Sequence, residues 1–153
     1  MKTLVFKPVT LCELDILCNI EVTYFVTDRL SRRQFIRFIK NNRIWGAFLG
    51  ETLIGYCIML SKQNSLKLRL YSIVITTDFQ GQGIWHSLLD YVIAQYQKVK
   101  AYTDVTLEVA VTNQKAIAAY KRYGFVITKN LISYYQDGTD AFSMTKKLSF
   151  SCC

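Results

Sequence analysis

The stretch YSIVITTDFQGQGIWHSLL, which runs from Tyr71 to Leu89, decides how this chain folds. Its first residues are mostly aromatic or β-branched and predict a strand that ends at Ile75. After Gly83, apolar residues recur at helical spacing and predict a long amphipathic helix. Glycines between a strand and a helix let the backbone turn sharply, and the first amides of the helix suit a pyrophosphate. An ordinary strand-to-helix turn is the alternative, because one Gly-x-Gly pattern is weak support for a phosphate site.

Outward from this stretch, hydrophobic patterning predicts further strands and helices. On the N-terminal side we expect a strand over 4–9, a helix over 11–20, a helix capped by Ser31, a hairpin of strands 44–49 and 52–60 turned by Gly50-Glu51, and a strand over 66–75. On the C-terminal side we expect a strand over 105–111, a helix over 116–123, and a hairpin of strands 126–135 and 141–148 turned by Asp137-Gly138. This order predicts the α/β (α+β) class: one domain over 1–153 with a single mixed, mostly antiparallel twisted sheet of about seven strands and about four helices on its faces.

Composition excludes several classes of protein. The chain has 153 residues, 51% of them hydrophobic, with 7 Gly and 1 Pro, which suits a packed core rather than a disordered or linker-rich chain. The net charge of +8 favours anionic partners: nucleic acid, an acidic protein surface or a phosphorylated cofactor. The five cysteines form no CxxC pair and the one histidine is His86, so we expect no metal site and a reducing, cytoplasmic location. No apolar run is long enough to span a bilayer, so we expect no membrane partner.

A second motif, LEVAVTNQKAIAAYKRYGF, runs from Leu107 to Phe125. With the Q-G-x-G of the first stretch, its N-x-x-A-x-x-x-Y-x-x-x-G-F pattern resembles the GCN5-related N-acetyltransferases (GNAT) over about 66–148. Within that superfamily, the LEV strand and the ending with Tyr134-Tyr135 and DGTDA are most similar to ribosomal-protein and protein N-terminal acetyltransferases. The resemblance implies a GNAT-like acyltransferase fold with acetyl-CoA as cofactor.

The resemblance also implies which residues contact acetyl-CoA. The backbone of residues 73–75 would pair with the pantetheine arm, and the turn at 81–86 would hold the pyrophosphate. The implied contacts are Ile73, Val74, Ile75, Gln80, Gly81, Gln82, Gly83, Ile84, Trp85, His86 and Asn113. Asn113 also suits a helix N-cap, and His86 also suits a partly exposed helix position. Trp85 departs from the family pattern, which has Gly or Ala there, so the indole would fill the cofactor path, tilt the helix or line the substrate slot.

By the same resemblance, Tyr120 protonates the departing thiolate of coenzyme A, and Glu108 is the general base that takes the proton of the acceptor amine. The alternative for Tyr120 is a core aromatic that packs with Ala116 and Tyr123. The alternative for Glu108 is a place on the wetter face of its strand, which alternation assigns to it together with Thr106 and Ala110. Tyr134 and Tyr135 are the implied substrate-binding residues.

We therefore interpret the chain as an enzyme that moves an acetyl group from acetyl-CoA to a primary amine, with a protein or peptide N-terminus as acceptor. The alternatives are an acetyltransferase of a small-molecule amine and a non-catalytic GNAT module that acts as a basic binding protein. We expect a monomer or homodimer, and nucleic acid only within a ribonucleoprotein substrate. The final Cys152 and Cys153 are similar to the prenylated tails of small trafficking GTPases, but we interpret them as a frayed end.

Overall fold

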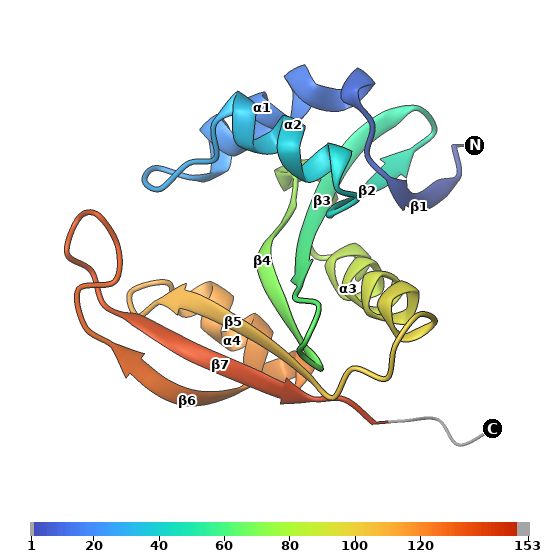
Figure 1. Ribbon diagram of the computed structural model, residues 1–153. Coiled ribbons are helices and arrows are strands. Elements are labelled where there is room, and N and C mark those ends of the chain that lie inside the picture. The colour runs from blue at the N-terminus through green and yellow to red at the C-terminus, as the bar shows by residue number, and fades with distance from the viewer. Residues whose placement is uncertain (1, 150–153) are drawn as a thin grey trace. The chain divides into compact units, whose positions relative to one another are not determined.

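A computed structural model describes residues 2–149, so Cys152 and Cys153 lie outside the described residues. Within 2–149 the chain forms seven strands and four α-helices (Figure 1). They are β1 (Leu4–Pro8), α1 (Leu14–Tyr24), α2 (Arg32–Lys40), β2 (Ile44–Leu49), β3 (Thr52–Ser61), β4 (Lys67–Ile75), α3 (Ile84–Gln97), β5 (Asp104–Ala110), α4 (Gln114–Tyr123), β6 (Val126–Leu131) and β7 (Ala141–Lys147). Two short 3-10 helices, η1 (Leu11–Glu13) and η2 (Thr77–Phe79), precede α1 and α3.

The strands are ordered β1-β2-β3-β4-β5-β7-β6 in the sheet. The pairs β1–β2, β2–β3, β5–β7 and β6–β7 are antiparallel, whereas β4–β5 is parallel. The predicted element order and the mixed, mostly antiparallel sheet are therefore confirmed.

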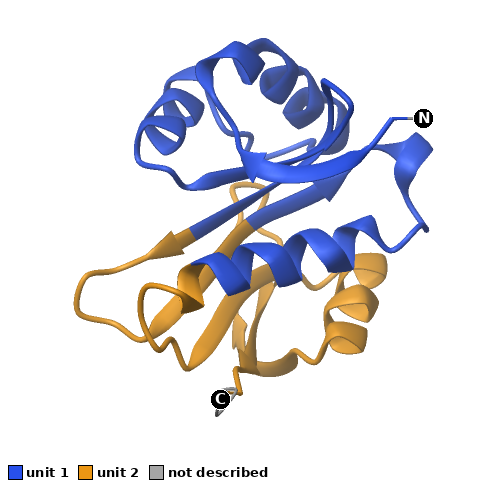
Figure 2. Ribbon diagram, turned by 90° about the vertical axis from the view of Figure 1, so that its right-hand side faces the viewer, with its two compact units in different colours: residues 1–59, 72–95 blue, residues 60–71, 96–153 orange. Residues whose placement is uncertain are grey.

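The chain divides into two compact units (Figure 2). Unit 1 comprises residues 1–59 and 72–95, and it contains β1, β2, most of β3, the end of β4, the two N-terminal helices and nearly all of α3. Unit 2 comprises residues 60–71 and 96–153, and it contains the start of β4 together with β5, α4, β6 and β7.

In unit 1, α2 begins with the Ser31 cap that the sequence predicts, and Gln34 completes a capping box. The Ser31 side chain accepts a hydrogen bond from the Gln34 amide, and the Gln34 side chain accepts one from the Ser31 amide, so two helix-terminal amides are satisfied. The buried face of α2 carries Phe35, whose ring lies edge-on to Tyr56 of β3 at 6.0 Å. The predicted β2–β3 hairpin is present, and Gly50 adopts the positive φ of 63° that its tight turn needs.

In unit 2, β5 alternates as predicted. Val105, Leu107 and Val109 are buried, and Thr106, Glu108 and Ala110 lie on the less buried face. The strand is flanked by the start of β4 and by β7 (Figure 1). Glu108 therefore projects from a strand that is paired along both of its edges.

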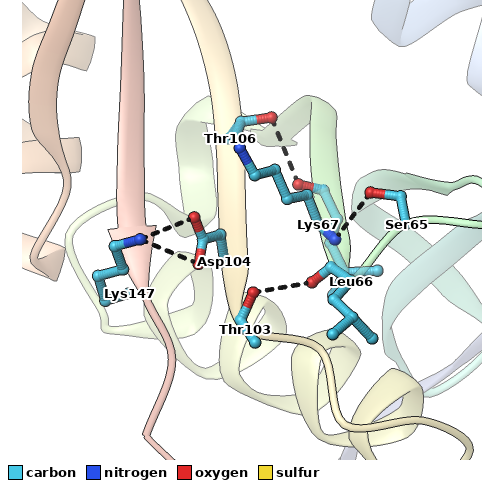
Figure 3. A network of polar contacts seen from close by, with 8 residues as sticks. Ser65, Leu66, Lys67, Thr103, Asp104, Thr106 and Lys147 are labelled. Atoms are coloured by element: carbon cyan, nitrogen blue, oxygen red, sulfur yellow. Dashed lines mark hydrogen bonds and ion pairs between the residues drawn. The ribbon is translucent and has the colours of Figure 1, made fainter.

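A polar network ties together the strand ends of unit 2 (Figure 3). Lys147 Nζ lies 3.1 Å from Oδ2 of Asp104, a residue only 4% exposed. Next to it, the Thr103 amide donates to the Leu66 carbonyl at 2.7 Å. Burial acts to raise the pKa of Asp104. Hydrogen bonds from Lys147 and Thr103 and the positive charges of Lys147 and Lys67 outweigh this effect, so the pKa lies below its ordinary value.

The last hairpin differs from the prediction in the length of its first strand. Strand β6 ends at Leu131, not at residue 135, and residues 132–140 connect it to β7. The predicted turn at Asp137-Gly138 is present, because the Gly138 amide donates to the Tyr135 carbonyl at 2.9 Å and Gly138 has a positive φ of 85°. Asp140 Oδ1 accepts the Ser133 amide at 2.8 Å, and Asp137 Oδ1 accepts the Thr139 amide at 2.9 Å. These side chains take backbone donors that a longer β-ladder would use, so pairing stops early.

Candidate active site

The glycine-bearing turn of unit 1 has the backbone that an anion site requires. Gly81 and Gly83 have φ angles of 78° and 79°, which disfavour any other residue, and a Cβ at either position would meet no described atom within 4 Å. Helical hydrogen bonding in α3 begins where the Ser87 amide donates to the Gly83 carbonyl at 3.1 Å. The amides of 84–86 thus precede the first helical bond, at the positive end of the helix dipole.

Two glutamine side chains hydrogen-bond to the backbone next to this turn. Gln80 Nε2 donates to the Ile75 carbonyl at 2.8 Å, and Gln82 Nε2 reaches the Asp78 carbonyl at 3.4 Å. Both residues were predicted as cofactor contacts, and in the structure their side chains hydrogen-bond to the backbone of the turn itself.

The other predicted cofactor positions of unit 1 lie on β4 and in the first turn of α3. Val74 and Ile75 are buried, and a Cβ at Gly55 of β3 would lie 2.6 Å from the Val74 carbonyl oxygen, so only glycine allows this approach of the two strands. Ile73, like Trp85, is half-buried, and Ile84 is buried. The exposed His86 places Nε2 3.5 Å from Asp90 Oδ2 one turn along the helix, which matches the exposed-helix alternative for this residue.

Sequence analysis missed a buried carboxylate at the end of α1. Glu21 is 4% exposed and accepts hydrogen bonds from the Tyr56 hydroxyl and, at 2.8 Å, from the Leu30 amide. Burial and the charge of Glu21 both raise the pKa of Tyr56, so this phenol keeps its proton and donates. Glu21 thereby ties the segment that joins α1 and α2 to the core of unit 1. The sequence did offer one sign that Glu21 is buried, because its helical spacing places it on the same face as the buried Leu14 and Leu17.

Unit 2 holds a cluster of three polar side chains, Arg69, Glu108 and Tyr134. Arg69 Nε lies 2.8 Å and Arg69 Nη2 lies 2.5 Å from Glu108 Oε1. The Tyr134 hydroxyl lies 3.3 Å from the same carboxylate oxygen and 3.2 Å from Arg69 Nη2. The cluster thus joins β4, β5 and the β6–β7 loop within one unit.

Exposure and charge differ within this cluster. The Glu108 side chain is 16% exposed, whereas that of Arg69 is 44% exposed. Burial and the Glu108 carboxylate raise the pKa of Tyr134, and the positive charge of Arg69 opposes this shift. Tyr134 is therefore a neutral hydrogen-bond donor near pH 7. The cluster orients a carboxylate, as a general base requires.

Arg69 was not predicted from the sequence. Its partner Glu108 is 39 residues away along the chain, and only the parallel β4–β5 pairing brings the two side chains together. The one local sign was an arginine between Leu68 and Leu70, both buried, which places it on the opposite face of the strand.

The remaining predicted residues of unit 2 occupy α4 and the last loop. Asn113 caps α4, because its side chain accepts the Ala116 amide at 3.2 Å, so the N-cap interpretation is confirmed. Tyr120 is half-buried and lies edge-on to Phe125 at 5.7 Å. Tyr135 packs edge-on against Tyr134 at 5.0 Å. Unit 2 therefore contains both predicted catalytic residues, both predicted substrate-binding tyrosines and Asn113.

Residues 2–149 contain no group of three or more His, Cys, Asp or Glu side chains that could hold a metal ion. No helix in the same range is long and apolar enough to cross a membrane.

Comparison with known proteins identifies a family and a fold. A family model described as the acetyltransferase (GNAT) family matches residues 12–125. N-alpha-acetyltransferase 30 of Schizosaccharomyces pombe is 32% identical over 111 residues, which are 68% of this chain and 65% of that protein. The chain thus spans less than two thirds of this relative, and about half of other curated relatives that it matches.

Solved structures share the fold. The ribosomal-protein-S18-alanine N-acetyltransferase of Escherichia coli superposes with a TM-score of 0.80 at 23% identity, covering 97% of this chain and 96% of that one. A chain of the NatC complex bound to Gag peptide and CoA gives a TM-score of 0.81 at 20% identity, covering 97% and 100%. These superpositions show a common fold, and at identities below 25% they show nothing more.

Proposed function

The chain belongs to the GNAT acetyltransferase family, and from this premise we propose that it transfers an acetyl group from acetyl-CoA to the N-terminal amine of a protein or peptide. Its relative from Schizosaccharomyces pombe is named an N-alpha-acetyltransferase, and the NatC structure holds a peptide together with CoA. The observation that carries the proposal is the Glu108 carboxylate, which Arg69 and Tyr134 hold in place beside a loop with two tyrosines.

In the proposed reaction the acceptor arrives as an ammonium ion and gives one proton to Glu108. The neutral nitrogen attacks the thioester carbonyl, so a C–N bond forms and the C–S bond breaks. Tyr120 gives its proton to the departing thiolate, the acylated nitrogen gives its second proton to the Tyr120 phenolate, and Glu108 releases its proton to solvent. A phenol suits this step because its ordinary pKa is close to that of a thiol. Atoms and charges balance without a metal or an oxidant.

The residues of unit 1 fit the cofactor that this reaction needs. The backbone of 73–75 would pair with the pantetheine arm, and the turn at 81–86 would bind the pyrophosphate. The positive φ angles of Gly81 and Gly83, together with the open space beside each, support this assignment. By the family resemblance, Asn113 would also contact the cofactor while it continues to cap α4.

We also propose that residues 1–153 act as one acyltransferase domain, because β3 and β4 each contribute residues to both units. We propose a cytoplasmic location as well, which the free state of Cys12, Cys18 and Cys57 supports.

Two measurements test the proposed function. Calorimetric titration of the full chain with acetyl-CoA should give saturable heat. Incubation with acetyl-CoA and unblocked peptides should then add an acetyl group to the α-amine, as mass spectrometry would show, and the same peptides with blocked N-termini are the control. Acetylation of spermine or an aminoglycoside alone would instead favour a small-molecule acceptor, and absence of cofactor binding would contradict the proposal.

A further inference from the structure

The carboxylate proposed as the base already has a cationic partner. Two nitrogens of Arg69 lie 2.8 and 2.5 Å from the same oxygen of Glu108. Together the two side chains carry no net charge. An acceptor that arrives as an ammonium ion therefore meets a positive guanidinium beside the base, and at this range like charges repel strongly in a partly buried setting. The cluster by itself does not attract an ordinary cationic N-terminus.

Both partners nevertheless keep hydrogen-bonding capacity toward a ligand. All hydrogen bonds that the described residues make to the Glu108 carboxylate go to Oε1, and none goes to Oε2. Arg69 uses Nε and Nη2, and no described residue accepts from its Nη1. With 44% of its side chain exposed, Arg69 is also the more accessible partner. A guanidinium has five donors and suits a carboxylate in particular.

We propose that Arg69 is a specificity-determining residue that selects acceptors whose first residue is Asp or Glu. This inference rests on the proposed function of the site. The side-chain carboxylate of such an acceptor supplies the negative charge that the cluster lacks and accepts from Arg69 Nη1, while its amine gives a proton to Glu108 Oε2. Because Arg69 and Glu108 are in contact, the carboxylate and the amine that bind them must belong to the same residue or to adjacent atoms of a small acceptor.

Tyr134 supports this division of roles. Its hydroxyl lies 3.3 Å from Glu108 Oε1 and 3.2 Å from Arg69 Nη2, so it contacts atoms of the ion pair that already contact each other. Tyr134 contacts neither Arg69 Nη1 nor Glu108 Oε2. These are the two atoms that we assign to the acceptor. The binding of an acidic residue therefore does not require the ion pair to break.

The experiment compares peptides that differ only in the charge of the first residue. Peptides beginning with Asp or Glu are assayed against the same peptides beginning with Asn or Gln, and kcat and KM are measured for the full chain. We expect kcat/KM to be about tenfold or more higher for the acidic peptides, mainly through KM. In Arg69→Gln this ratio should fall to near one, and Arg69→Lys should restore part of it.

Arg122→Gln is the matched control, because it removes one arginine charge from the exposed surface of α4 and should leave the ratio unchanged. Thermal unfolding of each variant verifies that it is folded. Equal kcat/KM for acidic and neutral peptides in the wild type would overturn the inference, as would an acidic preference that survives in Arg69→Gln. If the wild type acetylates neutral and acidic peptides equally, the proposed function is supported and only the role of Arg69 is overturned. If no peptide is acetylated, the proposed function is contradicted and the role of Arg69 with it.

Discussion

In the core of unit 1, the Tyr56 hydroxyl donates a hydrogen bond to the buried Glu21 carboxylate, 35 residues away along the chain. The same carboxylate accepts the Leu30 amide, so one side chain connects α1, β3 and the segment that leads into α2. A buried carboxylate that loses a donor keeps its desolvation cost. The position of the segment between α1 and α2 therefore depends on this pair.

Tyr56→Phe tests this dependence. The variant removes the donor and keeps the ring that packs against Phe35, so we expect the free energy of unfolding to fall by about 1–3 kcal/mol. Urea unfolding followed by circular dichroism measures the change. Tyr91→Phe is the control, because Tyr91 makes ring contacts with Phe6 and Trp45 that the variant retains. An equal loss in both variants would show that the Tyr56–Glu21 bond contributes nothing specific.

The Asp104–Lys147 pair in unit 2 predicts a dependence of stability on pH. Burial opposes ionisation, but the bonds and charges from Lys147, Thr103 and Lys67 lower the pKa of Asp104 below its ordinary value. A group with a lowered folded-state pKa adds stability above its unfolded pKa, about 3.9, and this stability is lost as the pH falls through the folded-state value.

Asp104→Asn should therefore lower the free energy of unfolding by about 1 kcal/mol at pH 7, with the difference from the wild type shrinking below about pH 4. Urea titrations at several pH values measure this. Asp78→Asn, at an exposed position in η2, is the control and should show no such trend. A difference that stays constant down to pH 2 would mean that the effect of Asp104 is packing and not charge.

The parts of the fold that could be predicted from the sequence depend on neighbours along the chain. Ser31 caps α2 through Gln34, and Glu108 faces away from Leu107 and Val109 because strand residues alternate. The Asp137-Gly138 turn was predicted in the same way, and only the end of β6 was placed too late, at residue 135 instead of Leu131. The contacts of the candidate site were harder to foresee.

Arg69 and Glu21 have partners that only the tertiary structure brings near. The Arg69–Glu108 and Tyr56–Glu21 contacts span 39 and 35 residues, and no periodicity encodes such pairings. The family resemblance predicted Glu108, Tyr120 and the two tyrosines because it is carried by motifs at fixed spacing. It did not predict Arg69, which lies outside those motifs. The side chain that we assign to specificity was therefore found from the structure.

Tyr120→Phe separates acid catalysis from packing. Tyr120 is half-buried and contacts the Phe125 ring, a contact that phenylalanine would keep. If the hydroxyl protonates the thiolate, kcat for acetyl transfer should fall roughly 10²-fold while the affinity for acetyl-CoA changes little. Steady-state kinetics and calorimetry measure the two quantities. A variant that keeps its turnover but unfolds at lower temperature would assign Tyr120 to the core.

Glu108→Gln tests the base. The amide keeps the size of the side chain and can still accept a hydrogen bond from Arg69, but it takes no proton from the acceptor amine. We expect the rate to fall roughly 10²-fold with acetyl-CoA binding intact. Steady-state kinetics and calorimetric titration measure the two quantities. Glu51→Gln, in the exposed β2–β3 turn, is the matched control and should keep the wild-type rate. An unchanged rate in Glu108→Gln would mean that the proton leaves by another route and that the ion pair with Arg69 serves to support the loop that carries Tyr134.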